Sequence, residues 1–161
     1  MPNICENELY ITGPMQHIKR FKKKAKSKAV VMPATANYPA EEPEEVDFKC
    51  SNLVPYPDDD TNLVEFYGTK WDCTGELLSE ETDARKVDGE LLYLIDSAWS
   101  PPLEWLRRVS EKFRKLRFDL KYVEHGMQFY GQAEAHNGDM YDYPGEDYEE
   151  AYPEQDEDCI S

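Results

Sequence analysis

The sequence predicts an α+β protein in which one antiparallel sheet carries two helices on one face. Alternating apolar residues near positions 10 and 120 are typical of half-buried strands, and two stretches with helical spacing lie between them. The resulting order is strand, helix, strands, helix, strands, which suits a two-layer sandwich. The chain has 161 residues, of which 40% are hydrophobic, so it can bury one core of ordinary size.

The first strand and helix follow from the spacing of apolar residues. Leu9 and Ile11 alternate with polar neighbours over residues 8–12, which predicts a strand with one buried face. From Pro14 onward apolar residues recur every three or four positions, which predicts a helix with one apolar stripe. The other faces of this helix are basic. Their cationic side chains are Lys19, Arg20, Lys22, Lys23, Lys24, Lys26 and Lys28.

The second half of the domain repeats this pattern. Residues 91–95 are apolar without alternation, as in a central strand. Ser100 and the two prolines after it predict the start of a helix that Ser100 caps. Alternation over 116–122 and a turn at 124–126 predict two further strands. The residues expected to form the core are Leu9, Ile11, Ile18, Phe21, Leu92, Leu94, Leu103, Leu106, Phe113, Phe118 and Leu120.

The C-terminal part of the chain differs in charge. The net charge is −16, and ten of the 34 acidic residues lie in residues 139–161, which contain no Lys or Arg. We therefore predict a domain over residues 1–135 and an acidic, Tyr-rich tail over 136–161 that is mobile unless a basic partner orders it. The alternative is a tail that only maintains solubility. The residues expected to bind a partner are Asp139, Tyr141, Asp142, Tyr143, Glu146, Asp147, Tyr148, Glu149 and Glu150.

Composition also bears on location and redox state. No apolar run is long enough to span a membrane, and the N-terminus has no basic and apolar leader, so we expect a cytoplasmic protein. The four cysteines are far apart and form no Cys-x-x-Cys pair, which favours reduced thiols over disulfides or a zinc site. They are Cys5, Cys50, Cys73 and Cys159.

Candidate catalytic and ligand residues are sparse. The only imidazoles are His17, His125 and His136, and none has a nucleophile at a spacing that indicates catalysis. We therefore expect no enzymatic activity, no metal and no cofactor. A pocket near Lys70, Trp71 and Asp72 could instead bind a small molecule such as a nucleotide. Trp71 and Trp99 are nevertheless expected to anchor the core.

Four ordered blocks of sequence carry a family resemblance. They are Met1-Pro2-Asn3 with Cys5 and Asn7; Gly68-Thr69-Lys70-Trp71-Asp72; Asp96-Ser97-Ala98-Trp99-Ser100-Pro101-Pro102; and Tyr122 and Glu124 leading into Gly126-Met127, Phe129 and Gly131. Together they cover residues 1 to about 135 and resemble the YubB-type proteins of bacteriophages and conjugative plasmids. The resemblance implies a ferredoxin-like fold without an iron–sulfur cluster, and a counter-defence role in a bacterial host.

Two functional hypotheses follow. In the first, the protein is a non-enzymatic inhibitor whose tail presents carboxylates to a basic host protein, one that binds nucleic acid or acts in defence, where DNA phosphates would otherwise lie. In the second, the basic helix binds nucleic acid through Lys19, Arg20, Lys22, Lys23, Lys24 and Lys26, and the tail autoinhibits it. Direct nucleic-acid binding is the less favoured hypothesis because the whole chain is acidic.

Overall fold

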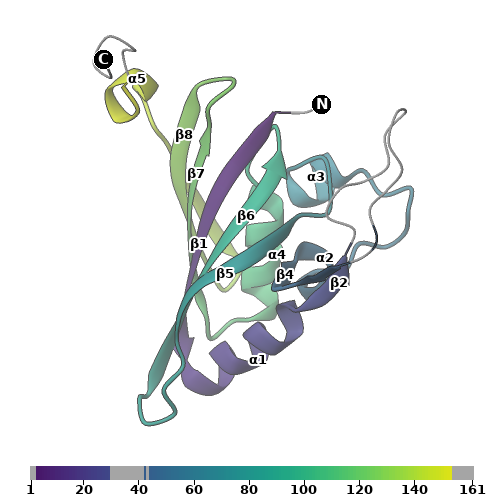
Figure 1. Cartoon of the computed structure of the whole chain (residues 1–161), viewed down its shortest axis with the longest axis vertical. Helices are drawn as coiled ribbons and strands as arrows, with labels where there is room; N and C mark the ends of the chain where they lie inside the picture. Colours follow the sequence, from purple (N-terminus) through teal and green to yellow (C-terminus); the bar gives the residue numbers. More distant parts are fainter. Residues whose placement is uncertain (1–2, 30–41, 43, 154–161) are drawn as a thin grey trace.

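The computed structural model describes residues 3–29, 42 and 44–153 (Figure 1). One sheet holds seven strands in the order β4-β5-β6-β1-β7-β8-β9, and β2 pairs with β3 beside it. The strands are β1 (Ile4–Pro14), β2 (Ser27–Ala29), β3 (Glu44–Val46), β4 (Phe48–Lys49), β5 (Thr74–Glu81), β6 (Asp88–Ala98), β7 (Arg117–Glu124), β8 (Phe129–His136) and β9 (Asp139–Pro144). The helices are α1 (Met15–Ala25), α2 (Cys50–Leu53), α3 (Leu63–Tyr67), α4 (Leu103–Lys112) and α5 (Tyr148–Ala151).

The two longest helices cover the same face of the sheet (Figure 1). α1 buries Ile18 and Phe21, and α4 buries Trp105 and Leu106. Their side chains meet the inner face of the sheet in one core, where the Phe21 ring lies 5.8 Å from that of Phe118. The predicted α+β sandwich, an antiparallel sheet with two helices on one face, is confirmed.

β1 lies at the centre of the sheet because each of its two edges pairs with an antiparallel neighbour. Leu9 pairs with Tyr93 of β6 on one side and with Leu120 of β7 on the other, and all three side chains are buried. The polar residues between them point to the opposite face, which the two long helices leave open. The predicted alternation in β1 and β7 is confirmed.

The buried face of β6 was predicted wrongly. Leu91, Tyr93 and Ile95 face the core, whereas Leu92 and Leu94 are half-buried on the open face. An apolar run without alternation carries no information about which face is covered. The register with β1 decides it, because each β6 residue must point to the same side as the β1 residue opposite it.

Two expectations about aromatic and cap residues also need correction. Trp105 is the fully buried tryptophan, whereas Trp99 is 43% exposed and Trp71 is half-buried. Ser100 does not cap α4; its hydroxyl donates to the carbonyl of Gly68 at 2.6 Å. Gly68 ends α3 in the left-handed region, at φ 87°, so its carbonyl is free to accept this bond.

The predicted boundary between a domain ending at residue 135 and a tail beginning at 136 differs from the fold. Residues 139–144 form β9, the last strand of the sheet, which pairs with β8 along its whole length. A two-residue turn, Asn137-Gly138, joins the strands with φ of 52° and 87°. Asn-Gly favours such turns because both residues tolerate positive φ. This local signal outweighs the repulsion between carboxylates.

Candidate protein-interaction surface

β9 presents aromatic side chains at the edge of the sheet. Tyr141 and Tyr143 lie on the open face, opposite Glu134 and Gln132 of β8, and each is 57% exposed. Large, rigid rings held at this exposure give contact area at a low cost in side-chain entropy. Both residues belong to the predicted partner-binding set.

The inner face of β9 anchors it to the domain. Met140 packs against the core, and Asp142 accepts a hydrogen bond of 2.7 Å from the Tyr122 hydroxyl. Burial of the Tyr122 ring and the nearby Asp142 carboxylate raise the pKa of this phenol. Asp142 therefore helps to hold the strand in place while it stays exposed.

α5 follows β9 as one acidic turn of helix. Asp147 caps it by accepting from the backbone N–H of Glu150 at 3.1 Å. The Tyr148 hydroxyl lies 2.5 Å from Nδ1 of His125, in the β7–β8 turn. Asp147 and Tyr148 thus have internal partners. All of the predicted partner-binding residues except Tyr148 are exposed; they are Asp139, Tyr141, Asp142, Tyr143, Glu146, Asp147, Glu149 and Glu150.

Acidic side chains also lie on the open face of the sheet, on strands away from β9. Glu6 of β1 lies directly opposite Asp96 of β6, and Glu76 of β5 follows on the next strand. Burial, Glu6 and Glu76, in that order, raise the pKa of Asp96 above its ordinary value. Carboxylates that oppose each other across strands destabilise the fold. A basic partner would relieve this repulsion.

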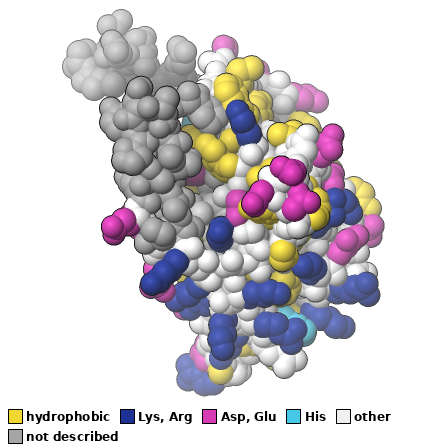
Figure 2. Space-filling model, turned by 90° about the vertical axis from the view of Figure 1, so that its right-hand side faces the viewer, with side chains coloured by type: hydrophobic (Ala, Val, Ile, Leu, Met, Phe, Trp, Pro, Cys, Tyr) yellow, Lys and Arg dark blue, Asp and Glu magenta, His cyan; other side chains and the backbone are white. Residues whose placement is uncertain are grey.

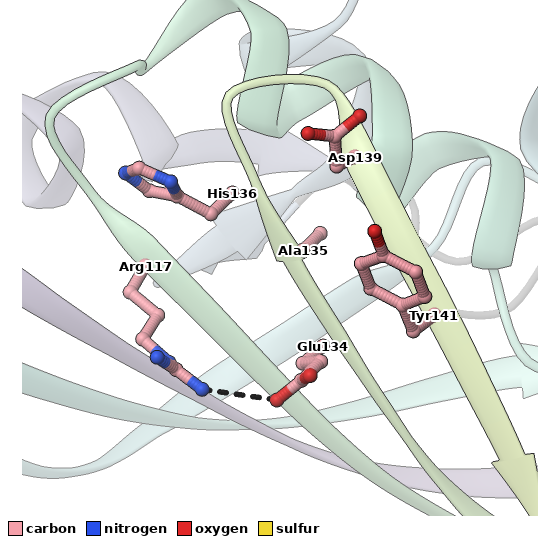
Figure 3. A pocket seen from close by; sticks show the side chains of 6 residues that line it. All are labelled: Arg117, Glu134, Ala135, His136, Asp139 and Tyr141. Carbon is pink, nitrogen blue, oxygen red and sulfur yellow. Dashed lines mark hydrogen bonds and ion pairs between the residues drawn. The ribbon is translucent and has the colours of Figure 1, made fainter.

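Figure 3 shows a shallow pocket where β7 and β9 begin and β8 ends. Its volume is about 190 Å³. Arg117 and Glu134 point toward each other and form an ion pair of 2.9 Å. His136, Asp139 and Tyr141 line the rest. His136, expected in a loop from the sequence, is the last residue of β8. Within the parts of the chain that the structure describes, no three His, Cys, Asp or Glu residues could hold a metal ion.

The basic helix α1 forms a separate surface. Figure 2 shows the face that the helices cover, where Lys and Arg side chains gather on the lower part. Lys19, Lys22, Lys23, Lys26 and Thr82 line a hollow of about 350 Å³ there. Lys22 forms an ion pair of 2.5 Å with Glu80 of β5.

The acidic helix α5 lies at the opposite end of the molecule from α1 (Figure 1). The described part of the predicted tail, up to residue 153, therefore does not cover the basic helix. The rest of the predicted autoinhibitory tail, residues 154–161, lies outside the described residues.

Several residues of the family blocks meet in one buried hydrogen-bond network. Asn7 donates to Ser97 Oγ at 2.9 Å and to the Ile95 carbonyl at 3.0 Å. Thr69 Oγ1 donates to the Ala98 carbonyl and accepts from its N–H. Asn7, Ser97 and Thr69 are fully buried. Because every bond in this network satisfies a buried polar atom, we assign these block residues to stability rather than to a ligand.

The predicted small-molecule residues have structural contacts too. Asp72 accepts from the backbone N–H of Ser51 at 2.9 Å and lies 3.7 Å from Lys49 Nζ. The Trp71 indole N–H donates to the Asp96 carbonyl, and Lys70 is exposed. These contacts fix the loop before β5.

The fold described above agrees with the results of comparison with known proteins. A family model described as the ferredoxin-like domain in Api92-like protein matches residues 67–160, more than half of the chain. The chain belongs to the Api92-like family. The crystal structure of Api92 from Yersinia pseudotuberculosis superimposes on this Api92-like fold with a TM-score of 0.59 and 11% sequence identity. The match covers 91% of this chain and 100% of that one, and at this identity it shows the fold alone. No curated protein matches the chain.

The Api92-like surface includes residues that sequence reasoning overlooked. Glu6 and Glu8 share the open face with Lys121 and Tyr130, next to Tyr152 of the α5 end. Alternation in β1 and β7 already places the first three on the polar face, but only the strand order brings them together. Among the described residues, no helix is both long and apolar enough to cross a membrane.

Proposed function

We propose that this protein is a non-enzymatic interaction domain that binds a basic protein surface through β9, α5 and the open face beside them. The observation that carries the proposal is the edge strand, which displays Tyr141 and Tyr143 within a segment of six carboxylates and no Lys or Arg over residues 139–153. Carboxylates form strong charge-assisted hydrogen bonds with Arg and Lys, and tyrosines supply apolar contact area.

The partner in this proposal is a host protein that binds nucleic acid or acts in defence. Its phosphate-binding surface would meet carboxylates where DNA phosphates otherwise lie, so the protein would act as a DNA mimic. The resemblance of the four sequence blocks to YubB-type proteins of phages and conjugative plasmids supports a counter-defence role in the bacterial cytoplasm. The negative open face supports it as well, because positive and negative surfaces attract during encounter.

A capture experiment tests this function. Immobilised protein is incubated with nuclease-treated bacterial lysate, and bound proteins are eluted with duplex DNA and identified by mass spectrometry. We expect DNA-binding proteins in the eluate, because DNA and the carboxylates would compete for one surface. Elution by salt alone, with no displacement by DNA, would contradict the DNA-mimic proposal.

Point variants locate the binding surface. We expect the double variant Tyr141→Ser and Tyr143→Ser to weaken capture by at least about tenfold, since aromatic anchors commonly contribute about 2 kcal/mol each. Val64→Ser is the control, because Val64 is similarly exposed, at 55%, but lies on α3, outside the proposed surface. Equal capture by the double variant and the control would exclude β9 as the recognition element.

The hollow on α1 supports a second candidate function, nucleic-acid binding. Four of its lysines could contact phosphates, although Lys22 is already paired with Glu80. Fluorescence anisotropy with single-stranded and duplex DNA at low salt tests it. Binding that falls for Lys19→Gln with Lys23→Gln, and not for Lys112→Gln on α4, would support it. Absence of binding by both the wild type and a chain that ends at residue 153 would refute it.

A further inference from the structure

A pocket on the open face lies between the sheet and α5. It has a volume of about 340 Å³, near the lower limit for small-molecule sites. β1, β7 and β8 form its floor, and Tyr152 at the end of α5 forms one wall. The space suits one side chain of a partner rather than a cofactor. We call it the α5 pocket.

Two carboxylates, Glu6 and Glu8, line this pocket, and Lys121 of β7 lies directly opposite Glu8. Within the described residues, no Lys or Arg lies within 4.0 Å of Glu6 or Glu8, and the nearest imidazole atom, His125 Nε2, is 3.9 Å from Glu6. Lys121 also lines the pocket, but its ammonium lies over the Tyr10 ring, 6.0 Å from the centroid. The pocket therefore has two carboxylates against one ammonium, and neither carboxylate is in an ion pair with Lys or Arg within the described residues.

The opposite wall is aromatic and held in place. Tyr152 packs edge-on against Tyr130 at 5.7 Å and against His125 at 5.4 Å, and it stacks on Tyr148 at 5.3 Å. The ring therefore has three aromatic neighbours that fix its orientation. Burial, followed by Glu8, raises the pKa of the Tyr152 phenol, which agrees with a hydroxyl close to the carboxylates.

We propose that the α5 pocket binds the guanidinium group of a single arginine from the basic partner. The proposal rests on the proposed function and specifies the chemistry of one contact within it. A guanidinium is planar and stacks on an aromatic ring, while its five N–H donors can reach several acceptors at once. Tyr130 and Tyr152 provide the rings, and Glu6, Glu8 and the amide oxygen of Gln132 provide the acceptors.

Arginine fits this pocket better than lysine for a geometric reason. Glu6 and Glu8 are two residues apart on one strand, so their carboxylates stand side by side on one face. A fork of donors can bond to both carboxylates at once, whereas an ammonium is a compact charge that stays more strongly hydrated.

NMR titration with defined probes tests the proposal. The ¹⁵N-labelled full chain is titrated with N-acetyl-arginine methylamide and, separately, with its lysine and citrulline counterparts. We expect the arginine probe to shift amide signals of Glu6, Glu8, Tyr130, Gln132 and Tyr152. Citrulline, which has the same shape without the charge, should bind at least about tenfold more weakly, and lysine several-fold more weakly.

Variants give matched controls. Glu8→Gln keeps the shape of an exposed side chain and should weaken the arginine probe at least about tenfold. Tyr152→Leu should weaken it as well. Glu90→Gln removes the same charge from the open face outside the pocket and should have no effect. Equal affinity for the arginine and lysine probes, or equal loss in Glu8→Gln and Glu90→Gln, would overturn the proposal.

A second measurement separates this proposal from the proposed function. An arginine-rich peptide is titrated against wild type, the double Tyr141→Ser and Tyr143→Ser variant, and Glu8→Gln. If peptide binding depends on the β9 tyrosines but not on Glu8, the pocket proposal fails and the interaction function stands. If binding depends on Glu8 and not on β9, the pocket stands and β9 is excluded. Loss in both variants, with the probe shifts above, supports both.

Discussion

At the scale of single residues, Asp96 shows the cost of an acidic surface most clearly. Its pKa in the folded protein is raised by burial and by the carboxylates of Glu6 and Glu76. A carboxyl group whose pKa is raised by folding stabilises the native state below the ordinary carboxyl pKa of about 4. That contribution is lost as the pH rises through the raised value. At neutral pH the ionised Asp96 therefore opposes folding.

We predict that Asp96→Asn is more stable than the wild type at pH 7, and that this gain shrinks as the pH falls through the raised pKa of Asp96 and is absent below about 4. Urea unfolding at pH 3 and pH 7 measures the difference in free energy of unfolding. Asp59→Asn, in an exposed loop, removes the same charge and serves as the control. A gain that does not depend on pH, or one that Asp59→Asn reproduces, would show that charge repulsion at Asp96 is not the cause.

At the scale of elements, neighbouring leucines of β6 lie on opposite faces of the sheet, one buried and one partly exposed. Leu91 is 1% exposed and Leu92 is half-buried on the open side. We predict that Leu91→Ala lowers the free energy of unfolding by about 2–5 kcal/mol, as for a buried leucine, and Leu92→Ala by about 1 kcal/mol. Both measurements use chemical denaturation. Because the two variants remove the same atoms from neighbouring positions, a larger loss for Leu92→Ala would mean that the register with β1 is shifted by one residue.

At the scale of the whole molecule, charge is distributed unevenly. The lysines of α1 lie at one end and the acidic helix α5 at the other (Figure 1). Such a distribution orients a basic partner during its approach and raises the association rate. We predict that the association rate constant with an arginine-rich peptide falls about tenfold between about 0.02 and 0.5 M salt, while the dissociation rate changes less. Stopped-flow fluorescence measures both rates. A salt effect mainly on dissociation would contradict steering.

The sequence by itself determined the α+β class, the two long helices and the alternating strands. These features depend on local periodicity: Leu9 and Ile11 share a face because successive strand residues point to opposite sides. It also contained the Asn137-Gly138 turn signal that predicts a hairpin, which the acidic composition of the following segment obscured. Local chemistry and local geometry are readable because neighbours in the chain are always neighbours in space.

Only the tertiary structure decided which face of β6 is buried, which tryptophan anchors the core and where the acidic segment begins to fold. Trp105 is buried because its side chain reaches from α4 to the residues around β4, where its ring meets that of Phe48 at 5.4 Å and its indole N–H donates to the Cys50 carbonyl. The α5 pocket likewise exists because the strand order places β1 beside β7, and because the end of α5 brings Ala151 and Tyr152 against this face. Contacts between residues far apart in sequence depend on strand register and helix docking. Both are set by the burial of the whole core rather than by any local pattern.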